Sequence, residues 1–103
     1  MKDALHIVYG KSPNVVWRAI AGESLLVPIR ASAADLSSIY SLNELGAFIW
    51  EALDGRRTVE DIIECVVREY DVAREDAERD VIEYLATLEQ IGVIVRCFPS
   101  GES

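Results

Sequence analysis

Apolar residues between positions 44 and 91 recur at the three- and four-residue spacing that is typical of amphipathic helices. The spacing predicts a first helix over 44–53, which is apolar around most of its circumference and is therefore expected to be buried on more than one side. Its N-cap is either Asn43 or Ser41, which has the spacing of a capping box with Glu44.

Two further helices are predicted downstream. Thr58 and Asp61 have the spacing of a capping box, which indicates the start of a second helix whose apolar face repeats to Tyr70. A third helix is predicted over 74–91, and Gly92 suits the left-handed residue that ends it. The apolar stripe of this third helix consists of Ala77, Val81, Tyr84, Leu85, Leu88 and Ile91.

Ahead of the helices, the pattern is typical of strands. Two strands are predicted over 15–21 and 24–29, joined by Gly22 and Glu23 in a type II′ turn, with Ile20 opposite Leu25. Both faces of this hairpin are largely apolar, so either the helices cover both faces or one face is an interface. The centre of that interface would be Trp17 and Leu26.

A third short strand is predicted over 38–42, and residues 93–95 would add a strand or pack back on the core. Residues 1–14 are expected to form a flexible lead-in, 15–96 a single domain, and 97–103 a tail. The expected fold class is α+β, with a three-stranded antiparallel sheet followed by a three-helix bundle that resembles a winged helix.

Charge and composition exclude several classes of function. The chain carries a net charge of −8, and the third helix is rich in carboxylates, which would repel DNA phosphates. No apolar run approaches the roughly 20 residues of a membrane span, and no secretory signal is present, so a cytoplasmic protein without a membrane partner is expected. Cys65 and Cys97 fit two reduced, unpaired thiols.

The sequence contains no catalytic pattern. His6 is the only histidine and lies in the expected lead-in, away from any acid–base partner. Asp76 and Asp80 have helical spacing and could share a cation, although a solvated helix face explains them better. The domain is therefore expected to be no enzyme and to hold no metal or cofactor.

The order and spacing of three segments resemble the PqqD family. The segments are Tyr40-x-Leu-Asn, Ile49-Trp-x-x-Leu-Asp-Gly, and the apolar run that ends in Ile91-Gly-Val-Ile-Val, and the resemblance extends over about 15–95. The family consists of small domains that recognise the leader segment of ribosomally made precursor peptides. The resemblance implies a non-catalytic peptide chaperone that presents the leader to a radical S-adenosylmethionine maturase. The product would be pyrroloquinoline quinone or a related modified peptide.

The resemblance also implies where a leader would bind, because in the family the peptide lies as an added strand between the third strand and the third helix. The matching strand residues are Ser38, Ile39, Tyr40, Ser41 and Leu42. On the third helix, Ile82 lies outside the apolar stripe, and it is either a contact for a leader side chain or a lone exposed isoleucine. The residues that share its shoulder of the helix are Glu78, Leu85 and Glu89.

The alternative is a non-catalytic interaction module of the same fold, which binds a folded partner through Trp17 and Leu26. A free strand edge and an apolar strand face would also allow a homodimer.

Overall fold

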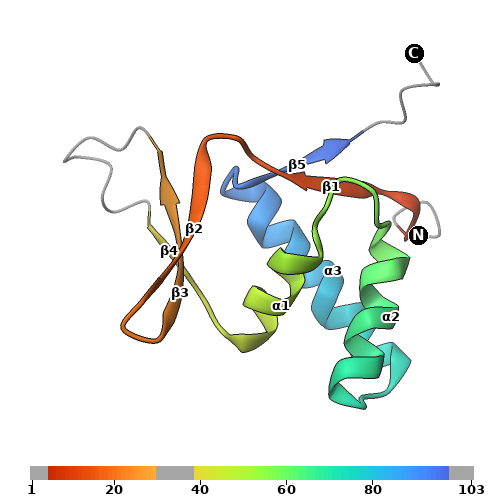
Figure 1. Cartoon of the computed structure of the whole chain (residues 1–103). Helices are drawn as coiled ribbons and strands as arrows, with labels where there is room; N and C mark the ends of the chain where they lie inside the picture. The colour runs from red at the N-terminus through yellow and green to blue at the C-terminus, as the bar shows by residue number, and fades with distance from the viewer. Residues whose placement is uncertain (1–4, 30–38, 98–103) are drawn as a thin grey trace.

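The computed structural model describes residues 5–29 and 39–97 of the 103-residue chain. It is an α+β fold in which a sheet of three antiparallel strands stands beside three helices, as the sequence predicts (Figure 1). The elements, in chain order, are β1 (Val8–Lys11), β2 (Val15–Ile20), β3 (Glu23–Pro28), β4 (Tyr40–Leu42), α1 (Glu44–Ala52), α2 (Val59–Tyr70), α3 (Arg74–Gln90) and β5 (Ile94–Cys97).

The hairpin between β2 and β3 differs from its predicted turn. Its two turn residues are Ala21 and Gly22, at φ angles of 53° and 81°, and Ile20 pairs with Glu23 instead of Leu25. Two consecutive left-handed residues define a type I′ turn, and an alanine rarely adopts this conformation, so the residue types signal the turn only weakly. The change of register equals two residues, and every strand side chain therefore stays on its predicted face.

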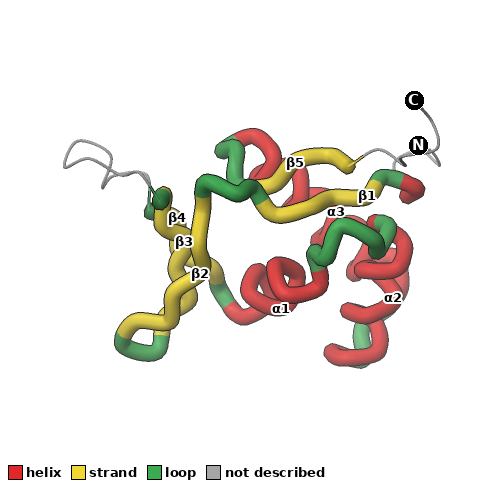
Figure 2. Tube along the Cα trace, turned by 45° about the horizontal axis from the view of Figure 1, so that its top comes forward, coloured by secondary structure: helices red, strands yellow, loops and turns green. Residues whose placement is uncertain are grey.

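The chain has a second, two-stranded sheet that the sequence analysis missed. β1 pairs antiparallel with β5, with Val8 opposite Cys97, and the two strands lie side by side across the helices (Figure 2). The amide of Val59 also donates to the carbonyl of Ile7 at 2.9 Å, which ties this ribbon to the start of α2. Residues 8–14 are therefore part of the fold and no flexible lead-in, and Cys97 belongs to a strand and not to a tail.

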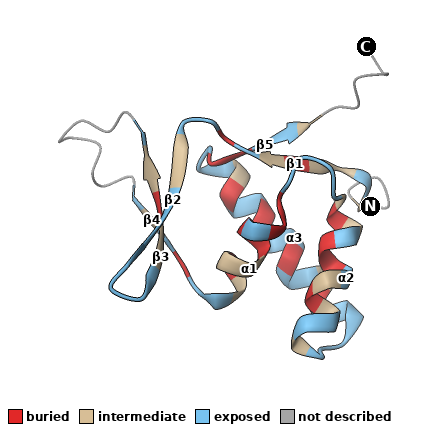
Figure 3. Cartoon of the chain, in the orientation of Figure 1, coloured by how far each residue is buried: buried red, intermediate tan, exposed pale blue. Residues whose placement is uncertain are grey.

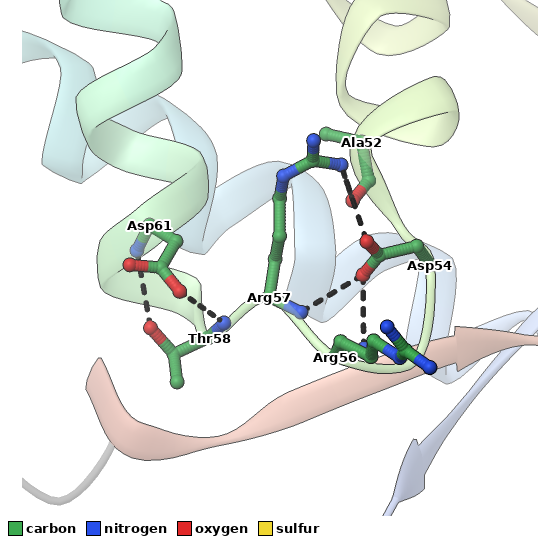
Figure 4. A network of polar contacts seen from close by, with 6 residues as sticks. All are labelled: Ala52, Asp54, Arg56, Arg57, Thr58 and Asp61. Carbon is green, nitrogen blue, oxygen red and sulfur yellow. Dashed lines mark hydrogen bonds and ion pairs between the residues drawn. The ribbon is translucent and has the colours of Figure 1, made fainter.

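The helix starts follow the sequence signals closely. The side chain of Asn43 accepts a hydrogen bond from the Gly46 amide at 2.8 Å, so Asn43 is the N-cap of α1, and Ser41 lies in β4. Thr58 and Asp61 form the predicted capping box at α2 (Figure 4). No side chain caps α3, which begins after Ala73.

The turn between α1 and α2 is organised by Asp54. One of its carboxylate oxygens accepts hydrogen bonds from the backbone amides of Arg56 and Arg57, at 2.9 and 2.8 Å (Figure 4). These hydrogen bonds lower the pKa of the Asp54 carboxyl, because they stabilise its ionised form. Gly55 follows at a φ of 78°, a conformation in which a side chain would be strained. The Asp54-Gly55 motif is thus fully explained by this turn.

The core lies among the three helices and the β1–β5 ribbon, and the three-stranded sheet contributes Leu26 and Leu42 to it (Figure 3). Leu26 of β3 is 1% exposed, so the face that carries Leu26 covers the core, and Leu26 cannot be the centre of an interface as the sequence analysis proposed. Trp17, its partner on the same face, remains 48% exposed at the edge of the sheet. The opposite face contains the exposed side chain of Ile20. In the described part of the chain, no helix is long and apolar enough to cross a bilayer.

Candidate functional site

A free strand edge lies at one end of the three-stranded sheet. The strand order is β2-β3-β4, and β4 pairs with β3 through Tyr40 opposite Leu26 and Ser41 opposite Leu25. Among the described residues, no strand pairs with the other edge of β4. The backbone N–H and C=O groups along that edge are therefore available to an incoming extended chain.

Beside this edge is a groove of about 400 Å³ between β4, the start of α1, and α3. The sheet side of the groove includes the ring of Tyr40, and the helix side carries two carboxylates and the ring of Tyr84. We refer to this feature as the β4–α3 groove, and its lining residues are Tyr40, Asn43, Leu45, Asp80, Glu83, Tyr84 and Thr87.

Tyr84 connects the two sides of the groove. Its hydroxyl donates to the side-chain oxygen of Asn43 at 3.3 Å, the same oxygen that caps α1. Burial raises the pKa of the Tyr84 hydroxyl, and the neighbouring Tyr40 adds to this rise. The phenol therefore keeps its proton at neutral pH and remains a hydrogen-bond donor, which fixes the position of the ring in the groove.

The helix side of the groove is acidic. Asp80 and Glu83 both line it, and the charged partner of Asp80 in the described chain is Arg79, at 3.7 Å. Arg79 also pairs with Asp76 at 3.2 Å, so its charge is shared. A basic or hydrogen-bond-donating side chain would consequently be favoured near Glu83.

The predicted strand residues have different environments. Tyr40 lines the groove, Leu42 is 5% exposed and belongs to the core, and Ser41 points to the other face of the sheet. Ile39, directly before β4, is 37% exposed. Ser38 lies outside the described residues.

The predicted residues of the third helix lie on the other flank of α3 from the groove. At 100° per residue, Ile82 is about 160° away from Tyr84 around the helix axis. Ile82 lines a second hollow on the surface of α3, together with Glu78 and with Glu83, which also lines the groove. Leu85 is 2% exposed and belongs to the core. The groove is instead lined by residues at positions 80, 83, 84 and 87, which sequence reasoning missed.

Glu89, on the same flank of α3 as Ile82, has two hydrogen-bonding partners outside the helix. Its carboxylate accepts hydrogen bonds from the Tyr9 hydroxyl at 3.0 Å and from Arg96 at 2.9 Å, and these residues belong to β1 and β5. Burial, followed by the interaction with Glu89, raises the pKa of Tyr9. Glu89 therefore joins α3 to the β1–β5 ribbon and does not line the β4–α3 groove.

The described residues offer no arrangement that would hold a metal ion, since no three His, Cys, Asp or Glu side chains come together for that purpose. Every buried side-chain nitrogen or oxygen in the same part of the chain has a hydrogen-bond partner. The distinctive chemistry of the groove is thus a free backbone edge next to two tyrosine rings and two carboxylates.

Two solved structures of other proteins have a similar fold. A solved structure described as TbiB1 in complex with the TbiA(beta) leader peptide is 26% identical over 82% of this chain and 93% of that chain, with a TM-score of 0.67. A second, described as lasso peptide synthetase B1 complexed with the leader peptide, is 23% identical over 84% of this chain and 96% of that chain, with a TM-score of 0.69.

A search of curated proteins finds no match to the chain. The model of the family described as coenzyme PQQ synthesis protein D (PqqD) matches residues 23–94, from β3 to β5. Because this match spans more than half of the sequence and agrees with the fold, the chain belongs to the PqqD family.

Proposed function

We propose that this protein binds the leader segment of a ribosomally made precursor peptide, which adds as a further strand to the free edge of β4. The observation that carries the proposal is the position of that edge, directly beside the β4–α3 groove. The similar TbiB1 structure supports it, because that protein is in complex with a leader peptide.

The geometry divides the recognition into two parts. Main-chain hydrogen bonds to β4 would supply affinity without regard to sequence, and the groove would select side chains that point toward α3. Tyr40 and Tyr84 offer aromatic surface for an apolar leader side chain, and Glu83 offers a charge for a basic one. Since a flexible peptide loses conformational freedom on ordering, we expect moderate affinity.

In this proposal the domain holds the leader while a separate enzyme modifies the core of the precursor. From the family resemblance we propose a radical S-adenosylmethionine maturase as that enzyme, with pyrroloquinoline quinone or a related modified peptide as the product. The likeness to a lasso peptide synthetase B1 makes a lasso-type leader an equally direct choice for the first experiment. A module that docks a folded partner through Leu26 is disfavoured, because Leu26 is buried.

The test is a titration of the isotope-labelled protein with the leader of a precursor encoded beside it. We expect chemical-shift changes at Tyr40, Tyr84 and Thr87, and new protection of the β4 amides from hydrogen exchange. A folded protein whose spectrum does not respond to that leader would contradict the proposal.

A matched pair of variants on α3 sharpens this test. Thr87→Arg places a long side chain in the groove, whereas Ile82→Arg places the same side chain on the opposite flank. Both positions are exposed, and arginine is a better helix former than either residue, so the helix should persist. We expect Thr87→Arg to weaken leader binding by about tenfold or more, which equals ~1.4 kcal/mol, and Ile82→Arg to leave the affinity unchanged. A larger loss of leader affinity in Ile82→Arg than in Thr87→Arg would instead place the leader site on the Ile82 flank of α3.

A further inference from the structure

A second hollow, of about 510 Å³, lies between β2, α1 and the end of α2. We call it the aromatic cleft, and its lining residues are Lys11, Trp17, Glu44, Ala47, Phe48, Trp50, Glu51, Glu69 and Tyr70. It shares no lining residue with the β4–α3 groove. A peptide bound along β4 would therefore leave the cleft open.

Four aromatic rings form the walls of the cleft. Phe48 and Tyr70 make an edge-to-face contact, with ring centroids 5.6 Å apart and an interplanar angle of 82°. Trp17 and Trp50 are the two tryptophans of the whole sequence, and both line this cleft. Trp17 is 48% exposed although it lies on the core-facing side of the sheet, so a large indole face remains open at the mouth of the cleft.

Three carboxylates surround these rings. They belong to Glu44, Glu51 and Glu69, and none of them takes part in an ion pair with another described residue. Burial raises the pKa of Tyr70, and the charges of Glu44 and then Glu69 add to the rise. The three carboxylates make the lining of the cleft acidic.

The cleft already holds one cation of its own. The ammonium nitrogen of Lys11 lies 5.5 Å from the centroid of the Trp50 ring, within the range of a cation–π interaction. Lys11 is the single cationic residue among those that line the cleft, so one positive charge faces three negative ones. This charge imbalance would favour a second cation in the cleft, in contact with the exposed ring of Trp17.

We propose that the aromatic cleft is a second binding site, which accepts an arginine or lysine side chain that projects from a folded partner protein. Aromatic faces together with carboxylates are the surroundings that a guanidinium or ammonium group prefers. The cleft presents ring faces and carboxylates, which suit the insertion of a single cationic side chain. The net charge of −8 would also favour the approach of a basic partner.

The charge requirement can be tested with two small probes. N-acetylarginine amide carries the guanidinium, and N-acetylcitrulline amide has nearly the same shape without the charge. The indole N–H signals of Trp17 and Trp50 report on the cleft alone, because no other tryptophan is present. We expect saturable shifts of both signals with the arginine probe, at affinities in the millimolar range, and a response several-fold weaker with the citrulline probe. Equal responses to the two probes, or no saturable shift, would overturn the proposal.

Three variants separate this site from a general effect of the acidic surface. Glu51→Gln combined with Glu69→Gln should weaken arginine binding by about fivefold, and Glu64→Gln, an exposed carboxylate of α2 outside the cleft, should not. Lys11→Gln removes the competing cation and should tighten binding by about twofold to fivefold. Weaker binding to Lys11→Gln, or an equal loss in Glu64→Gln, would contradict a cation site in the cleft.

A further titration distinguishes a partner protein from the leader as the source of the cationic side chain. The arginine titration is repeated with the β4–α3 groove saturated by a leader peptide. Unchanged arginine affinity supports a site for a partner protein, whereas displacement of the probe would assign the cleft to the leader and overturn the proposal. The titration without leader does not depend on the proposed function, so failure of one proposal can be told from failure of the other.

Discussion

Tyr84 of α3 lies so closely over Gly46 of α1 that a Cβ atom at position 46 would collide with its ring and hydroxyl. The same hydroxyl donates to Asn43, so the ring is held from two sides. The absence of a side chain at Gly46 therefore allows α1 and α3 to meet at the base of the β4–α3 groove, where Tyr84 is one of the lining residues.

Gly46→Ala should destabilise the protein although alanine is the better helix former. The gain from helix propensity is at most about 1 kcal/mol, whereas overpacking against the Tyr84 ring costs roughly 1–3 kcal/mol. We expect a lower free energy of unfolding in urea and altered shifts at Tyr84. In a Tyr84→Ala background the collision is gone, and Gly46→Ala should then be neutral or stabilising. A loss of the same size in both backgrounds would show that Tyr84 is not the cause.

Thr58→Ala removes the side chain that caps α2. The Thr58 hydroxyl accepts from the Asp61 amide at 3.1 Å, and its loss leaves that donor without its capping acceptor. We expect the free energy of unfolding to fall by about 1 kcal/mol. Thr87→Ala is the control, because its hydroxyl bonds to a carbonyl within its own helix and caps nothing. Equal effects of the two changes would contradict the role of the capping box.

Glu89→Ala should weaken the fold and leave leader binding intact. It removes the acceptor of Tyr9 and Arg96, and a lost hydrogen bond to a partly buried group costs about 1 kcal/mol. Gln90→Ala, at the exposed neighbouring position, should change little. Urea unfolding and a leader titration give the two readouts. A drop in leader affinity at unchanged stability would instead place Glu89 in the binding site.

Asp54 makes the stability of the turn after α1 depend on pH. Its pKa is lowered in the folded protein below the usual range of an aspartate, so the ionised carboxylate contributes stability above that usual range. This contribution is lost as the pH falls through the folded-state pKa. Asp54→Asn should therefore be less stable than the wild type at about pH 7, and the difference should shrink at about pH 2.5. A difference in unfolding midpoint that is the same at both pH values would exclude this role of the charge.

The elements that the sequence predicted correctly are those with local signals. Caps such as Asn43 and Thr58 lie within three residues of the groups they satisfy, and the apolar stripes of the helices repeat every turn. β1 has no such signal, because its partner β5 lies at the other end of the described chain and Gly10 interrupts its pattern. The type I′ turn was missed because Ala21 adopts a conformation that its residue type disfavours.

The strand residue Tyr40 lines the groove, whereas Ile82, which the sequence analysis expects beside a bound leader, lines the other flank of α3. A helical pattern identifies the buried stripe, but the flanks on either side of it are equivalent until the helix is packed against the sheet. Here α3 turns Tyr84 toward β4 and Ile82 away from it. The helical pattern puts Tyr84 on the apolar stripe, and the polar residue Asp80, one turn before it, lies on the flank that lines the groove.

The pairing of β1 with β5 has a consequence for how the protein is made. Val8 to Lys11 are synthesised before the helices, whereas their hydrogen-bonding partners, Ile94 to Cys97, are synthesised after them. A strand pair so far apart in the sequence forms late, since long-range contacts are slow to find. The helices and the β2-β3-β4 sheet can therefore assemble during translation, and the ribbon completes the domain only when its C-terminal strand becomes available.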